Sequence, residues 1–343
     1  MTTRHAVLLL GLAAVAPTAA GADRPAPFDG SPATEPALFA PGVVSTGDYE
    51  LNAAFTRDLG TVFFCVASPV FPFPNTYSTI VSSSWTGRSW TEPEVAPFSG
   101  RYSDIDPYFS PDFQRIFFMS DRPREGSAPA DFDLWYVERR GDGWSEAVHT
   151  GAGVNSEAMD GYPAVAADGS LYFFSTRPGG YGPADIYVAE PDGAGWSEPV
   201  NLGPAINSAA ADTNVYVAPD ESYMIFSSSR VDPASPFADM DLYVSFRRDG
   251  VWQPAESLGD SVNTPAWEFT PMVSPDGRYL FFARAALTED TRYREARPVT
   301  YAELRARVRG PGNGLGDVYY VAPAALRPES RGTEDGTDCS RPG

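Results

Sequence analysis

Short apolar runs, many alternating with polar positions, recur along the chain between turn-forming residues. Five segments share one pattern: an acidic residue, a first apolar run, a turn, and a second run that ends in Phe. They span residues 50–64, 104–118, 160–174, 212–226 and 268–282. Their turns carry an Asp in each copy, a residue that tolerates the left-handed dihedrals of tight hairpins. Each segment therefore predicts a β-hairpin.

Two further elements follow each hairpin. A third apolar run begins near residues 78, 132, 184, 240 and 316, and in four copies a Trp and a fourth element come after it. Four short strands per repeat of roughly fifty residues, without helical periodicity, are typical of one blade of a β-propeller. The Gly and Pro spacing within the segments excludes a helical repeat.

The number of copies predicts five blades. The last copy ends after its third strand, near Val321, whereas residues 39–50 resemble the fourth element that precedes each later copy. Ser45 stands five residues before Glu50, as Asn155, Asn207 and Asn263 stand five before the next acidic residues. We expect an all-β fold, a five-bladed β-propeller of four-stranded antiparallel blades over residues 39–322, with the last blade closed by the N-terminal strand so that no sheet edge stays free.

The same segments carry a family resemblance. SPDFQRIFFMSDRP, ADGSLYFFSTRPGGYGPADIYVAE and APDESYMIFSSSR resemble the PD40 repeat, also called the WD40-like β-propeller repeat, of the TolB-like propeller family. The resemblance covers about residues 42–322 and implies the fold. It implies no single function, because propellers of this type serve many roles.

Both ends of the chain predict segments outside the propeller. Residues 1–22 contain a weakly basic start, a short apolar run and Ala20-Gly21-Ala22, the pattern of a cleaved signal peptide, which predicts a periplasmic or secreted protein. Residues 23–38 are expected to be a linker and residues 323–343 a disordered polar tail. The two cysteines, Cys65 and Cys339, carry no framework pattern, and whether they pair stays open.

Charge limits the possible partners. The chain has a net charge of −20 and contains no Lys. A field of that sign repels nucleic acid and anionic membrane surfaces, so neither nucleic-acid binding nor membrane insertion is expected. We expect a monomer or a member of an envelope complex.

Few residues in the sequence suit catalysis. His149 would be the one histidine left after signal removal, it lies in a fourth-strand element, and no G-x-S-x-G motif occurs. We therefore expect a structural histidine, no catalytic residues, no cofactor and no transition-metal site.

The acidic residues that open the hairpins are the first candidate site. In a propeller they lead into the strand that lines the channel, so they are expected to form an acidic ring at the channel mouth: Glu50, Asp104, Asp160, Asp212 and Glu268. Such a ring could bind a cation or supply a glycosidase carboxylate pair. The alternative is that they cap backbone N–H groups or pair with the arginines that end the second strands. Recurrence of the carboxylates in every copy favours this alternative. The arginines are Arg122, Arg177, Arg230 and Arg284.

The fifth repeat contains an exceptional insertion at residues 285–315. Thr300 and Glu303 form a capping box, and Tyr301, Leu304 and Val308 share one face of a predicted docked helix. Seven arginines cluster here if the one at its base is counted: Arg284, Arg292, Arg294, Arg297, Arg305, Arg307 and Arg309. The insertion either covers the acidic mouth or presents a basic surface to a partner.

These patterns predict a non-catalytic scaffold. It would bind a protein or a saccharide through the face that carries the loops between second and third strands. A carboxylate-dependent glycoside hydrolase of the five-bladed type is the alternative. An unequal carboxylate pair would support the enzyme, and equivalent Arg-paired carboxylates would support the scaffold.

Overall fold

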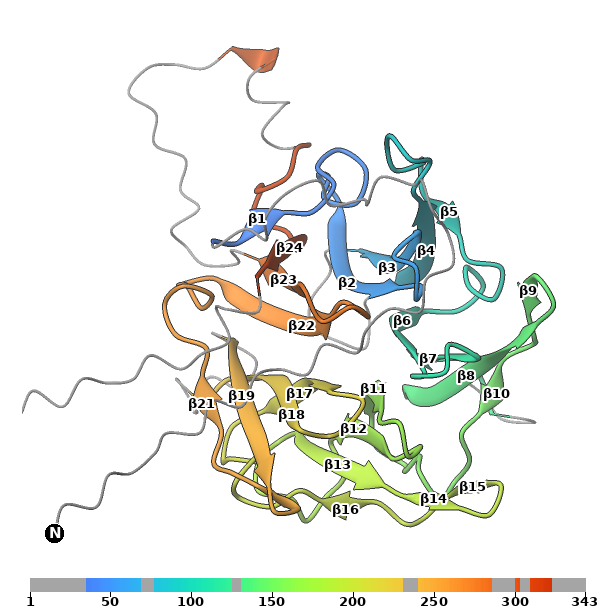
Figure 1. Ribbon diagram of the computed structural model, residues 1–343, viewed down its shortest axis with the longest axis vertical. Coiled ribbons are helices and arrows are strands. Elements are labelled where there is room, and N and C mark those ends of the chain that lie inside the picture. The colour runs from blue at the N-terminus through green and yellow to red at the C-terminus, as the bar shows by residue number, and fades with distance from the viewer. Residues whose placement is uncertain are drawn as a thin grey trace, which may run out of the picture.

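Five four-stranded blades surround a common centre in the computed structural model (Figure 1). It describes residues 35–68, 77–124, 131–230, 240–285, 300–302 and 309–322. The predicted signal peptide, the tail, Cys339, Arg305, Arg307, Leu304 and Val308 lie outside these ranges. Among the described residues, no helix is both long and apolar enough to cross a membrane.

Each blade is an antiparallel sheet, and in blades one to four the strands follow chain order from the centre outwards. Blade one consists of β2 (Tyr49–Phe55), β3 (Thr61–Ala67), β4 (Ser78–Ser84) and β5 (Glu94–Val95). Blade two consists of β6 (Asp104–Phe109), β7 (Arg115–Ser120), β8 (Asp133–Arg140) and β10 (Val148–His149). Blade three consists of β11 (Asp160–Val165), β12 (Leu171–Ser175), β13 (Asp185–Ala189) and β16 (Val200–Asn201).

Blades four and five complete the ring. Blade four consists of β17 (Asp212–Val217), β18 (Tyr223–Ser228), β19 (Asp241–Arg248) and β21 (Glu256–Ser257). Blade five consists of β22 (Trp267–Val273), β23 (Leu280–Ala285), β24 (Asp317–Val321) and β1 (Ala37–Leu38). Short ribbons extend the rim at β9 (Gly143–Trp144), β14 (Pro191–Asp192), β15 (Gly195–Trp196) and β20 (Val251–Trp252).

The N-terminal strand closes the last blade, as the sequence predicts. β1 pairs with β24, with Leu38 opposite Tyr319, and Ser45 Oγ donates to Val318 O at 2.9 Å. One boundary is wrong: β1 begins at Ala37, inside the segment expected to be a linker, because the pairing starts two residues before residue 39. The five-bladed propeller is thus closed by residues distant in sequence.

The recurring Asn five residues before each acidic residue has a structural explanation. Asn207 Oδ1 accepts from Ile186 N at 2.8 Å, and its Nδ2 donates to Ile186 O at 2.9 Å. Asn155 and Asn263 bind Leu134 and Leu242 in the same way. The side-chain amide thereby extends the sheet at the start of each third strand, where the two-residue fourth strand does not reach.

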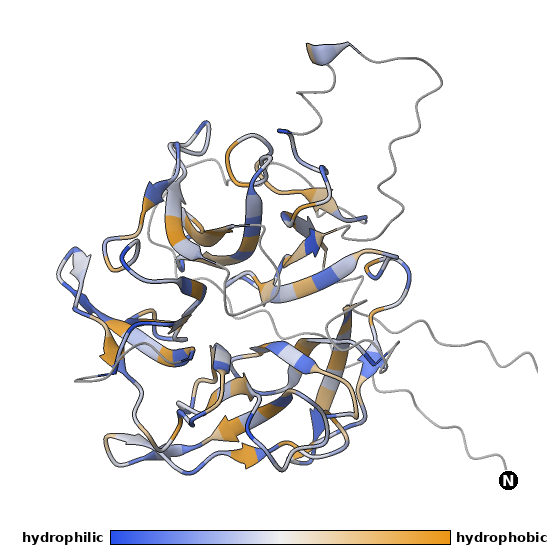
Figure 2. Ribbon diagram, turned by 180° about the vertical axis from the view of Figure 1, so that it is seen from behind, coloured by the Kyte–Doolittle hydropathy of each residue, from blue (hydrophilic) through white to orange (hydrophobic). Residues whose placement is uncertain are grey.

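Apolar side chains of all five blades form one main core. Its members include Phe64, Phe118, Phe173, Phe226 and Phe282, the residues that end or nearly end the second apolar run of each copy. Figure 2 shows hydrophobic colour on the strands and hydrophilic colour on many of the connecting loops. The core is continuous because each blade is too thin to bury its own faces and packs against its neighbours.

Candidate functional site

The five acidic residues of the predicted ring lie at or next to the start of the innermost strands. They are almost completely buried, with exposed fractions of 1% for Glu50 and 0% for Asp104, Asp160, Asp212 and Glu268. Each accepts hydrogen bonds from a Ser or Thr four or five residues earlier, as Asp160 does from Ser156 N and Oγ. These carboxylates are therefore part of the blade interior and present almost no surface to a ligand.

An arginine neutralises four of the five carboxylates. The shortest N–O distances are 2.6 Å for Arg122–Asp104, 2.8 Å for Arg177–Asp160, 2.6 Å for Arg230–Asp212 and 2.7 Å for Arg284–Glu268. Each pair lies within one blade. The guanidinium also donates to a carbonyl of the connection from the preceding blade, at Phe98, Val154, Ile206 and Val262. The arginines thus join the second strand to the connection from the preceding blade. This is the pairing that the sequence analysis gave as the alternative to ligand binding by the acidic ring.

Blade five reaches the same pairing by a different register. In blades two to four a Ser lies opposite the Asp, and the Arg stands two residues further on. In blade five Arg284 itself lies opposite Glu268. The longer glutamate compensates for the shift, because Arg284 still reaches Val262 O at 2.7 Å. Burial is the largest influence on Glu268 and raises its pKa, although Thr264 and Arg284 oppose the shift.

Blade one has no such arginine within the described residues. Ser68 occupies the position, and Glu50 is held by Thr46 through its backbone N–H and its hydroxyl. Burial, with a contribution from the charges of Asp317 and Asp48, raises the pKa of Glu50 to about 7. The predicted ring therefore consists of four ion pairs and one carboxyl group in a different environment.

The described end of the arginine insertion contacts the segment before β2, at Gly47. Tyr301 and Ala302 are helical, but the Tyr301 side chain is 75% exposed, so its predicted place on a docked face is wrong. A Cβ atom on Gly47 would lie 2.3 Å from the carbonyl carbon of Arg309, and Asn313 Nδ2 donates to Gly47 O. Close backbone packing at the end of the insertion, rather than the Tyr301 ring, makes this contact. The Arg309 residue is exposed.

A second ring of residues lies on the innermost strands and was missed by the sequence analysis. At the third residue of each acidic segment the backbone is left-handed although the residue is not glycine, with φ between 48° and 62°. These residues are Asn52, Asp106, Tyr162, Asn214 and Thr270, and each lies where the pairing with the second strand shifts register. Such β-bulges turn a side chain away from its regular direction.

Asp106 is the acidic member of this second ring. Its exposed fraction is 5%, its backbone N–H donates to Cys65 Sγ at 3.3 Å, and burial raises its pKa to about 7. Cys65 is a free, buried thiol. A single carboxylate in this ring does not provide the pair that glycoside hydrolysis requires.

His149 has a structural environment, as expected. Its Nε2 lies 3.1 Å from Asp133 Oδ2, Gly151 N donates to its Nδ1, and its ring meets Trp135 edge to face at 4.8 Å. These contacts orient the ring within blade two.

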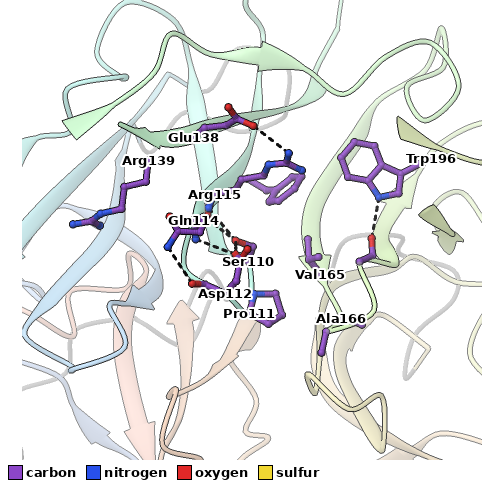
Figure 3. Close-up of a pocket in the computed structure, with 13 residues that line it drawn as sticks. Ser110, Pro111, Asp112, Gln114, Arg115, Glu138, Arg139, Val165, Ala166 and Trp196 are labelled. Carbon is purple, nitrogen blue, oxygen red and sulfur yellow. Dashed lines mark hydrogen bonds and ion pairs between the residues drawn. The ribbon is translucent and has the colours of Figure 1, made fainter. Parts of the chain in front are cut away.

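A surface pocket of about 460 Å³ lies between blades two and three, on the face opposite the predicted binding face (Figure 3). On the blade-two side, Arg115 donates to Glu138 at 3.1 Å beside Gln114 and Asp112. Trp196 forms the blade-three side, and its Nε1 donates to Gly169 O at 3.0 Å. The sequence analysis did not identify this pocket.

The joint next to this pocket carries two different side chains at the corresponding positions. Between blades three and four, the Tyr172 hydroxyl bonds to Glu221, which also pairs with Arg247. The corresponding residues at the joint of blades two and three are Phe117 and Gly169, as the strand pairing and the turn hydrogen bonds show. The joint of blades two and three therefore lacks the hydroxyl and the carboxylate that meet at the next joint. The pocket is thus a local departure from the repeat.

The comparisons with known proteins find structures of similar fold. No family model matches the chain, and no curated protein matches it. A protein assigned as TolB from Agrobacterium tumefaciens is 14% identical, with a TM-score of 0.46 and coverage of 80% of this chain and 90% of that one. An α-L-arabinofuranosidase from Lactobacillus brevis is 14% identical, with a TM-score of 0.49 and coverage of 81% of this chain and 91% of that one. A thermostable family-43 glycoside hydrolase is 12% identical, with a TM-score of 0.48 and coverage of 82% of this chain and 91% of that one. Likeness at this level says nothing about function, and the five blades are defined by the strand pairing of this chain itself.

Proposed function

We propose that the chain is an exported, non-catalytic propeller of the PD40 type that binds a saccharide in the pocket between blades two and three. The supporting observation is the departure from the repeat: Phe117 and Gly169 line a pocket, whereas Tyr172 and Glu221 hydrogen-bond to each other at the corresponding positions of the next joint. A structural device is kept in every blade, whereas a ligand site needs one joint that differs. Export rests on the N-terminal pattern of residues 1–22.

The lining favours a neutral, hydroxyl-rich ligand. Arg115 and Arg139 balance Asp112 and Glu138, so the pocket carries no net charge despite the charge of −20 on the chain. Burial raises the pKa of Asp112, but hydrogen bonds from Ser110 and Gln114 and the charge of Arg115 lower it overall. Ionised carboxylates, guanidinium groups and the Gln114 amide match hydroxyl donors and acceptors, and Trp196 offers an apolar wall.

The proposed site is therefore not the face predicted from the sequence. The acidic ring is buried and four of its members are paired with arginine. Binding through Arg305, Arg307 and Arg309 stays a prediction.

An oligosaccharide array followed by calorimetric titration tests this proposal. We expect Trp196→Ala and Glu138→Gln to weaken binding by at least about tenfold, since they remove the wall and one acceptor. Trp252→Ala is the matched control, because Trp252 occupies the same place at the filled joint of blades three and four. Equal loss in both Trp variants would contradict the assignment to this pocket.

The same experiment separates binding from hydrolysis. Two carboxylates, Asp112 and Glu138, line the pocket. Recovery of the bound oligosaccharide unchanged supports a binding protein. Cleavage that Glu138→Gln abolishes would replace the proposal with the glycoside hydrolase.

A further inference from the structure

The pocket between blades two and three continues onto the neighbouring joint of blades one and two. Arg139 lies on the side of the pocket away from Trp196, as Figure 3 shows, and its guanidinium carbon is 5.5 Å from the centre of the Trp144 ring. Trp144 holds in blade two the place that Trp196 holds in blade three, because each ends the short rim strand of its blade. Arg139 thus belongs both to the pocket and to the next joint.

A second arginine reaches the same surface from blade one. Arg57 lies in the turn after β2, and its Nη2 donates to Pro111 O at 3.4 Å and to Asp112 O at 3.5 Å. Pro111 and Asp112 line the pocket. The Arg57 guanidinium lies over the Phe113 ring, with its carbon 4.6 Å from the ring centre. The surface beside the pocket therefore carries two guanidinium groups, each placed over an aromatic ring.

Both guanidinium groups keep hydrogen-bond donors for a ligand. Arg57 and Arg139 are exposed residues. The five N–H donors of a guanidinium lie at the edges of a planar group, so a group whose carbon contacts a ring still has donors to offer. Contact with the ring also restricts the side chain before a ligand arrives, which lowers the entropy lost on binding. Such donors match the hydroxyl oxygens of a sugar.

Blade four shows that this arrangement is not a fixed part of the repeat. Arg247 occupies the place of Arg139, since each pairs with the Trp of the rim strand in its blade. Arg247 forms an ion pair with Glu221, whereas the corresponding turn residue of blade two is Phe113. Blade four therefore uses its guanidinium for an internal ion pair, and blade two has an aromatic ring in place of that carboxylate.

We propose that the ligand of the pocket is an oligosaccharide whose chain passes over Arg139 and continues to Arg57 at the joint of blades one and two. Asp58 lies in the same turn as Arg57, and Asp142 lies in the turn between β8 and β9, so this surface has carboxylates beside its guanidinium groups. Neutral hydroxyl groups therefore match it better than an anion does. The proposal rests on the saccharide site proposed above and adds the length of the ligand and the direction in which it runs.

Calorimetric titration with a disaccharide, a tetrasaccharide and a hexasaccharide of the series that the array identifies tests this proposal. We expect the affinity to rise by about tenfold from the disaccharide to the longer ligands, because hydrogen bonds from charged donors at the second joint add to those in the pocket. Arg57→Gln should reduce that rise to about twofold or less. Arg248→Gln is the matched control, since it removes the same charge from an exposed arginine of blade four, and it should keep the rise.

The possible failures are distinguishable. No binding at any length, or binding that Trp196→Ala does not weaken, would refute the saccharide pocket and the extension with it. Equal affinity for all three lengths, together with a loss in Trp196→Ala, would leave the pocket in place and overturn the extension. An equal loss for short and long ligands in Arg57→Gln would also overturn it, because Arg57 would then only hold the turn that contains Pro111 and Asp112.

Discussion

Arg230 illustrates how a buried charge is satisfied in this propeller. Its guanidinium donates to Asp212, to Ile206 O and to Ser228 Oγ, and it lies over Phe226 and Tyr243. The planar group uses several donors at once while its faces contact aromatic rings. Lysine could not make this set of contacts, which is consistent with a chain that contains arginine and no lysine.

Removing this guanidinium should be costly. Arg230→Met would leave Asp212, which is 0% exposed, without its counter-charge, and we expect a loss of about 3–5 kcal/mol in the free energy of unfolding. Urea unfolding measures it. Arg115→Met is the control, because the Arg115–Glu138 pair is partly exposed and should contribute less than about 1 kcal/mol. Similar losses in both variants would show that burial does not determine the strength of these pairs.

Asp106 should make stability depend on pH. Burial raises its pKa to about 7, from an ordinary value near 4 in the unfolded chain. The folded protein therefore binds one more proton between these values, and stability falls as pH rises from about 4 to 7. Asp106→Asn should remove part of this decline, on the order of 2–4 kcal/mol at pH 8. Unfolding curves at pH 5 and pH 8 for both proteins measure the difference, and parallel pH profiles would contradict the assignment.

Repetition makes some of these residues predictable and leaves others hidden. The carboxylates recur in every copy and the arginines follow at similar spacing in four of them, so their pairing can be inferred from the sequence, even with the shift at Arg284. The left-handed residues cannot, because Asn52 or Thr270 in a strand gives no sign of a positive φ. The pocket between blades two and three could not be predicted either, because it lies where Gly169 and Phe117 differ from Glu221 and Tyr172 of the next joint. Only a comparison of the copies with the strand pairing known reveals that difference.

At the scale of elements, the closing strand is the most distinctive part of the architecture. β1 has two residues and forms few backbone bonds. Phe39, which follows it, is 2% exposed and meets Phe55, Trp90 and Phe281 edge to face, with ring centroids 5.3–5.5 Å apart. Side-chain packing next to the strand therefore complements its few hydrogen bonds.

Phe39→Ala should destabilise the ring. The change creates a cavity between blades one and five, and we expect a loss of about 3–5 kcal/mol in the free energy of unfolding. Tyr301→Ala is the control, since that ring is 75% exposed and should contribute almost nothing. Urea unfolding of both variants provides the measurement, and a negligible loss for Phe39→Ala would mean that the closing segment is not held by this packing.

At the scale of the molecule, the blades share one main core and should unfold together. The main cluster of buried side chains contains residues from every blade, including Phe39 near the N-terminus and Val321 near the end of the described chain. No blade is packed apart from its neighbours. Cooperative unfolding follows, although each sheet is complete in its own hydrogen bonds.

Deleting residues 23–48 should lower the melting temperature of the whole propeller. The truncation removes β1, Phe39 and Ser45, and it exposes the edge of β24. Differential scanning calorimetry should show one transition at lower temperature. An unchanged Tm, or a second transition for blade five alone, would contradict closure by this segment.

The pairing of β1 with β24 also has a consequence in time. Ser45 and Val318 are separated by 273 positions, so the first strand to be synthesised waits for almost the last before it finds its partner. Long-range pairing of this kind is slow, because the chain must order a large loop first. A nascent chain that stops before β24 leaves its N-terminal strand unpaired and its ring open. The ring therefore closes only after β24 has been synthesised.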